Sequence, residues 1–217
     1  PVLAICDPEI TIGLPKSLTA ACGVDALTHC IEAYTVQLHQ PITDALALKG
    51  ISMIAENLEK AYENGEDREA RRNMMIASTI GGMAFISSNV GAVHAFAETV
   101  GAWFDTPHGV ANSLFLPYIM EFNIPACPER FADIADAMGI EREESMSDEQ
   151  YALKAVEYVK ALNRKLNIPT IKEIKGITEE RFEAIAERSA NNVLSNDNAR
   201  KITKEDYLEL LKKAYNE

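Results

Sequence analysis

Residues 91–112 read GAVHAFAETVGAWFDTPHGVAN and hold two of the four histidines of the chain. The run 91–104 predicts a helix that carries His94. Around His108, the proline and glycine of Thr-Pro-His-Gly predict a turn at 106–109 rather than a continued helix. A helix followed by a turn brings two imidazoles toward one point, so this stretch predicts a shared site for both histidines.

A second pair, Asp25 and His29, stands at i and i+4 in CGVDALTHCIEAY. This spacing places both side chains on one face of a helix. With His94 and His108 the pair gives one carboxylate and three imidazoles, a donor set that suits Fe²⁺ or Zn²⁺. On spacing alone, a surface pair or a hydrogen-bonded core histidine is the more common arrangement. His39, in VQLHQP, is off any ligand spacing and is expected to be a solvated loop histidine.

Apolar residues spaced three and four apart predict an all-α, multi-helix domain of two packed helical groups. Besides 91–104, the expected helices run from a cap at 17 or 19 to about 36, from 41 to the glycine at 65, from about 67 through the small-residue run 77–85, and over 110–123, 128–138, 148–166, 178–191 and 203–215. Pro117 should kink or interrupt its helix. Gly81 and Gly82 predict a close helix–helix approach.

Two further features concern the ends and divisions of the chain. Pro1–Cys6, PVLAIC, predicts a short strand, which would need a partner. From about Ile124 the predicted helices become more charged, which predicts a subdomain boundary near that residue. Because the chain starts at proline without a methionine, we expect it to be a piece of a longer polypeptide.

The bulk composition excludes several classes of partner. The formal net charge of −12 argues against nucleic acid and anionic membranes, since both need a basic surface. No apolar run approaches the roughly 18 residues of a membrane span, and no signal peptide opens the chain. We therefore expect a soluble, cytoplasmic protein.

Three segments together resemble the C-terminal domain of the iron-containing (group III) alcohol dehydrogenases. They are LPKSLTAACGVDALTHCIEAYTV, PITDALALKGISMIAENL and TPHGVANSLFLPYIMEFN, and they run in order between about Asp7 and Asn123, with a weaker echo in ITKEDYLELLKKAY. The resemblance implies a helical domain of the dehydroquinate synthase-like type that binds Fe²⁺ or Zn²⁺ through Asp25, His29, His94 and His108. It further implies an alcohol or aldehyde substrate, NAD or NADP, a homo-oligomer, and an N-terminal dinucleotide-binding domain outside this chain.

The resemblance assigns two more residues. Leu18 matches a position that touches the coenzyme in the family. Glu98 stands four residues after His94, where many relatives have a second histidine in the pattern His-x-x-x-His. A carboxylate there would act as an acid or base, support the metal shell from outside, or form a salt bridge, and it puts the family's proton relay in doubt.

The sequence is also compatible with other functions. The helical domain would also suit a zinc-dependent protein like glycerol dehydrogenase or dehydroquinate synthase, or a helical interaction domain with a structural metal. The spacing D-x-x-x-H followed by H-x₁₃-H with TPHGVAN favours the alcohol dehydrogenases. Because no glycine-rich anion site follows a strand, we expect the isolated chain to bind metal but to show negligible alcohol–NAD(P) turnover.

Overall fold

A computed structural model describes residues 2–217 and confirms the all-α prediction. Short 3₁₀ turns join nine α-helices in this part of the chain. They are α1 (Lys16–Thr35), α2 (Pro41–Glu63), α3 (Arg68–Ser88), α4 (Ala92–Phe104), α5 (His108–Asn123), α6 (Pro128–Ala137), α7 (Asp148–Lys165), α8 (Phe182–Ala190) and α9 (Lys204–Asn216).

The strand predicted for Pro1–Cys6 is wrong over its described part. Residues 2–6 adopt no regular secondary structure and are exposed. A strand needs a neighbour for its backbone N–H and C=O groups, and the described residues provide no other strand. Pro1 itself lies outside the described residues.

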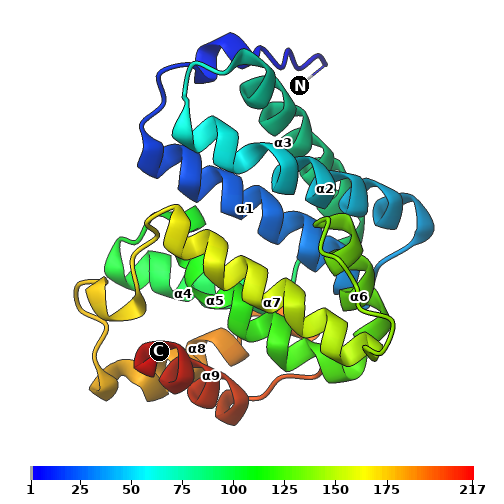
Figure 1. Ribbon diagram of the computed structural model, residues 1–217. Helices are drawn as coiled ribbons and strands as arrows, with labels where there is room; N and C mark the ends of the chain where they lie inside the picture. Colours follow the sequence, from blue (N-terminus) through cyan, green and yellow to red (C-terminus); the bar gives the residue numbers. More distant parts are fainter. Residues whose placement is uncertain (1) are drawn as a thin grey trace.

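The helices pack as two groups that meet along α1 and α5. Figure 1 shows α1–α3 in blue to teal on one side, and α4, α5 and α7 in green to yellow on the other, with α8 and α9 beyond them. A single cluster of buried side chains extends from Ala20 to Ala214 and includes residues on both sides of Ile124. The subdomain boundary near Ile124 stays a prediction.

Several helices begin where their side chains supply caps. Ser147 accepts a hydrogen bond from the backbone N–H of Gln150, whose side chain accepts from Ser147 N, at the start of α7. Thr203 and Asp206 form the same reciprocal pair at the start of α9. Such capping boxes satisfy backbone donors that have no partner inside the helix.

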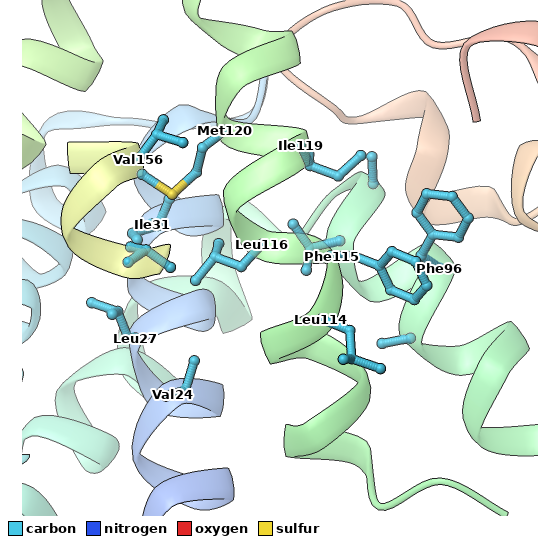
Figure 2. Close-up of a cluster of buried hydrophobic side chains, with 14 of the residues drawn as sticks. Val24, Leu27, Ile31, Phe96, Leu114, Phe115, Leu116, Ile119, Met120 and Val156 are labelled. Carbon is cyan, nitrogen blue, oxygen red and sulfur yellow. The ribbon is translucent and has the colours of Figure 1, made fainter. Parts of the chain in front are cut away.

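α5 is the central helix of the core because it is apolar on nearly all sides. In Figure 2, Leu116 and Met120 extend toward Ile31 of α1, while Phe115 faces Phe96 of α4. The rings of Phe96 and Phe115 stack with centroids 4.0 Å apart. Each of these fully buried side chains contributes about 1.5–3 kcal/mol, so α5 fixes both helical groups at once.

The predicted close approach at the glycine pair is right for one glycine. A Cβ on Gly81 would lie 3.1 Å from Cys30 Sγ, so α3 approaches α1 closely at this point. A Cβ on Gly82 would meet no described atom within 4 Å. Close packing between helices therefore explains the glycine at position 81 but not the one at position 82.

α3 and α4 are separated by a sharp bend. Asn89 follows α3 with φ at 74° and ψ at −174°, a backbone conformation that few residues other than glycine adopt. Among the described residues, no single helix has the length and apolar character to cross a bilayer, and α3 with α4 reach it only as a pair bent by 106°. The bend carries the chain from the first helical group into the second.

Two polar side chains between α8 and α9, Asp197 and Asn198, connect the ends of distant helices, and we call them the polar junction. Asp197 accepts a hydrogen bond from Asn89 Nδ2 at 2.6 Å. Asn198 Oδ1 accepts from Ala92 N at 3.3 Å and from Asn123 Nδ2 at 3.0 Å, and its Nδ2 donates back to Asn123 at 2.7 Å. The junction thus ties the end of α3, the start of α4 and the end of α5.

Pro117 does not interrupt α5, which runs through it without a break. A proline cannot donate to the carbonyl four residues earlier, which here belongs to Ser113. Asn163 Nδ2 of α7 donates to that carbonyl oxygen at 2.7 Å. The neighbouring helix therefore replaces the missing helical hydrogen bond.

We expect Asn163→Ala to destabilise the chain by about 1–3 kcal/mol, because it leaves the Ser113 carbonyl without its donor. The same substitution should cost less in a Pro117→Ala background, where the new N–H of residue 117 can reach Ser113 O within the helix. Urea unfolding of the four chains measures this coupling. Equal costs in the two backgrounds would show that Asn163 does not compensate for the proline.

Candidate functional site

Three helices bring the four predicted ligand residues together. α1 carries Asp25 and His29 one turn apart, α4 carries His94 in its first turn, and α5 begins at His108. The turn predicted at 106–109 is wrong for His108, because the connection ends at Pro107. A proline at a helix start loses no hydrogen bond, and its fixed φ suits the first turn.

The donor atoms of these residues converge. Asp25, His29 and His94 offer ligand atoms that all lie within 4.8 Å of one another. His29 Nε2 and His94 Nε2 are 3.1 Å apart, and His108 Nε2 is 3.5 Å from Asp25 Oδ1. Four donors bound to one ion at about 2.1 Å in a tetrahedron would lie about 3.4 Å apart. The spacing of Asp25, His29 and His94 therefore fits a single divalent ion, while His108 lies at the edge of this group, close to Asp25.

Hydrogen bonds fix which ring nitrogens face the centre. His29 Nδ1 lies 2.8 Å from the carbonyl oxygen of Asp25, so it must carry a hydrogen. His94 Nδ1 lies 2.5 Å from a carboxylate oxygen of Glu32 and must carry one too. Neutral imidazole then has its lone pair on Nε2. Two lone pairs facing each other at 3.1 Å need a proton or a cation between them.

The two facing imidazoles, His94 buried and His29 partly buried, differ in proton affinity. Burial and the neighbouring charge of His94 lower the pKa of His29. Burial also lowers the pKa of His94, but the hydrogen bond and the negative charge of Glu32 outweigh it, so the net pKa of His94 is raised. Of the pair, His94 therefore has the higher affinity for a proton.

Two residues at the site escaped the sequence analysis. Glu32 is 3% exposed and accepts hydrogen bonds from Val93 N and His94 Nδ1. Its signal was a glutamate inside the apolar run after His29, at i+3 on α1. Asn112 is fully buried four residues after His108, a spacing that places both on one face of α5.

The side chain of Asn112 points at the converging donors. Its Nδ2 lies 2.5 Å from Asp25 Oδ1 and 3.2 Å from Nε2 of both His94 and His108. Its Oδ1 is buried and has no hydrogen-bond partner among the described residues. A buried acceptor without a partner calls for an ion or an ordered water, whereas the group that faces Asp25 and the imidazoles is the Nδ2 donor.

The remaining predicted residues lie around this centre. Glu98 is exposed on α4, and its carboxylate accepts a hydrogen bond from Asn192 Nδ2 at 2.6 Å. In the described structure it makes no hydrogen bond or ion pair with the four ligand residues. Leu18 is 46% exposed in the first turn of α1. His39 lies exposed in the loop after α1, with Nδ1 3.2 Å from Asp44 Oδ2, as expected for a loop histidine.

The side chains meet because α5 begins directly against α1. A Cβ on Gly109 would lie 2.2 Å from Ala21 O and 3.2 Å from Asp25 Cβ. Only glycine permits this approach, since real Cβ atoms do not come within 3.0 Å of such neighbours. The residue beside His108 therefore sets its distance from Asp25.

Comparison with known proteins gives a consistent result. The sequence profile described as "Fe-containing alcohol dehydrogenase family, C-terminal" matches residues 19–215. Alcohol dehydrogenase 4 of Saccharomyces cerevisiae is 43% identical over 218 residues, which are 99% of this chain and 55% of the yeast protein. The 1,3-propanediol dehydrogenase of Klebsiella pneumoniae is 40% identical over 215 residues, again 99% of this chain and 55% of the relative.

A solved structure agrees with these sequences. The crystal structure of a 1,3-propanediol oxidoreductase superposes with a TM-score of 0.93 at 40% identity, covering 96% of this chain and 54% of the other. The chain thus spans about half the length of the relatives that it matches.

We expect Gly109→Ala to weaken the binding of Zn²⁺ by about tenfold or more, because the added Cβ must push α5 and His108 away from α1. Competition with a chromophoric chelator measures the affinity. Gly82→Ala is the matched control: its Cβ meets nothing within 4 Å, so affinity should stay unchanged while stability rises by about 0.5–1 kcal/mol. An unchanged affinity for Gly109→Ala would mean that the close approach does not set the site.

Proposed function

This chain belongs to the iron-containing alcohol dehydrogenase family, whose C-terminal region it matches, and on that premise we propose that it is the metal-binding half of an NAD(P)-dependent alcohol dehydrogenase. The observation that carries the proposal is the facing pair of Nε2 atoms, 3.1 Å apart, beside the carboxylate of Asp25. The relatives are named alcohol dehydrogenase and 1,3-propanediol dehydrogenase. These names support an alcohol or aldehyde substrate over the reactions of glycerol dehydrogenase-like and dehydroquinate synthase-like proteins.

In this proposal Asp25, His29, His94 and His108 hold one Fe²⁺ or Zn²⁺ ion, both of which suit nitrogen and carboxylate donors. When bound, such an ion supplies Lewis acidity that polarises an alcohol or aldehyde oxygen. The chain's own part is to fix the donors: two Nδ1–H groups are engaged by Asp25 O and Glu32, so two Nε2 atoms are directed inward.

The exposure of the site supports a catalytic metal over a structural one. Structural zinc sites are closed by four protein ligands, whereas a catalytic site keeps an open side. The side chain of His108 is 49% exposed and that of Asp25 is 23% exposed, while His94 is buried. A small alcohol can therefore approach from the side of His108, which argues against a helical interaction domain with a structural ion.

Two residues have roles at the edge of this site. Glu98 lies one helical turn after His94 and outside the converging donors, where its carboxylate acts as an acid or base or supports the shell from outside. The hydrogen bond from Asn192 is consistent with the alternative, a structural carboxylate. In this proposal Leu18 contacts the coenzyme, and its exposure at the start of α1 supports that role.

The coenzyme itself would be held mainly by residues beyond these 217. The described residues contain no strand followed by a glycine-rich loop, which is the usual anion site for a dinucleotide. The relatives extend well beyond the matched half. This division leaves metal binding to the present chain and most of the coenzyme contacts to the rest of the protein.

Replacing His108 by alanine should weaken Zn²⁺ binding because it removes one of four donors. The stability of the metal-free chain should change by no more than about 0.5 kcal/mol, since this side chain is half exposed. His39→Ala provides the control, because His39 lies in a loop away from the site. Titration of both variants and of the unmodified chain with Zn²⁺ measures the stoichiometry and the affinity. If His108→Ala kept the original stoichiometry and affinity, the proposed ligand set would be wrong.

The zinc-loaded chain alone should show negligible oxidation of short alcohols with NAD or NADP. Hydride transfer needs donor and acceptor held together, a proximity contribution of about 7–11 kcal/mol that an untethered coenzyme largely loses. The absorbance of NAD(P)H during steady-state assays measures the rate. A turnover near the roughly 10 s⁻¹ common to enzymes would show that these residues contain the coenzyme site.

A further inference from the structure

Glu32 is a buried carboxylate on α1 with both oxygens engaged by α4. It is 3% exposed, although carboxylates are rarely buried without compensation. Oε1 accepts a hydrogen bond from the backbone N–H of Val93 at 2.7 Å, and Oε2 accepts from His94 Nδ1 at 2.5 Å. Consecutive residues of α4 therefore hold the two oxygens of one carboxylate.

The local structure is arranged to admit this carboxylate. Gly91, which precedes α4, offers no side-chain cap, so Glu32 and Asn198 supply the acceptors for the first turn from other parts of the chain. A Cβ on Gly91 would lie 3.1 Å from Glu32 Oε1, tighter than most real contacts. A negative charge at a helix N-terminus is favourable. In the described residues His94 is the only ion-pair partner of Glu32.

We propose that Glu32 is a positioning residue for the metal: it keeps the hydrogen of His94 on Nδ1, so that Nε2 presents its lone pair to the ion. The inference rests on the proposed function and deepens it. His29 receives the same orientation from a neutral carbonyl, that of Asp25. A carboxylate lies 2.5 Å from His94 Nδ1, whereas the nearest carboxylate oxygen to His29 Nδ1, that of Asp25, is 3.5 Å away. A hydrogen-bonded carboxylate also makes an imidazole a stronger ligand.

The chemistry of glutamine makes the inference testable. Glutamine has the shape of glutamate but offers one acceptor and one NH₂ group. Val93 N–H is a fixed donor, so the glutamine oxygen must face it. The NH₂ group then faces His94 Nδ1 and favours the ring form with its hydrogen on Nε2, directed at the metal position. Glu32→Gln therefore reverses the orientation without removing the side chain.

The experiment measures Zn²⁺ affinity and the hydrogen position in the same chains. Competition with a chromophoric chelator gives the affinity of the unmodified chain, Glu32→Gln and the control Glu121→Gln. Glu121 lies on α5, pairs with Lys213, and touches none of the four ligands. Proton–nitrogen NMR of the metal-free chains, at a pH where His94 is neutral, locates the hydrogen of its ring, which a merely structural role of Glu32 would leave on Nδ1 in Glu32→Gln as well.

The expected result is a 10- to 100-fold loss of affinity in Glu32→Gln, no loss in Glu121→Gln, and an Nδ1–H signal of His94 in the unmodified chain that disappears in Glu32→Gln. An affinity for Glu32→Gln within about threefold of the original, or an unprotonated Nδ1 in the unmodified metal-free chain, overturns the inference. The position of the His94 hydrogen in the unmodified chain tests the inference even if Glu32→Gln does not fold. If the unmodified chain binds no zinc, the proposed function fails and the inference falls with it.

Discussion

The contact between the start of α5 and the backbone of α1 is the constraint on which the rest of the structure depends. Gly109 lies so close to Ala21 that no side chain fits between the helices. From that point α5 runs along the core, with its apolar residues shared between α1 on one side and α4 on the other. The close contact brings His108 to Asp25, while the apolar packing holds α4 and its histidine in range.

The site also illustrates how a fold can hold like groups together. Several hydrogen-bond acceptors converge on one point, an arrangement that is unfavourable for isolated groups in a medium of low polarity. Each buried ring is fixed from behind, His29 by a carbonyl of its own helix and His94 by Glu32. The free energy of these bonds and of the surrounding core offsets the repulsion among the inward-facing atoms.

Local sequence patterns were sufficient for the helices but not for all of their ends. The spacing of apolar residues predicted α1–α9 because each helix buries one face, whereas Pro107 and Gly109 indicated a turn where α5 already begins. Spacing and resemblance singled out Asp25, His29 and His94, whose donor atoms converge, and His108, which lies beside Asp25. Glu32 was missed because its role depends on His94, 62 residues away, and no local pattern records such a contact.

The polar junction has a consequence for how the protein loses its structure. Ala92, two residues before His94, donates to Asn198, which lies 106 residues later in the chain. The same asparagine exchanges two hydrogen bonds with the end of α5. Fraying of the segment between α8 and α9 would therefore spread to the first turn of α4 and to the end of α5, two of the three helices that carry the imidazoles. The arrangement of the converging donors thus depends on the integrity of this segment, and a protease that nicks the chain there would act on the site from a distance.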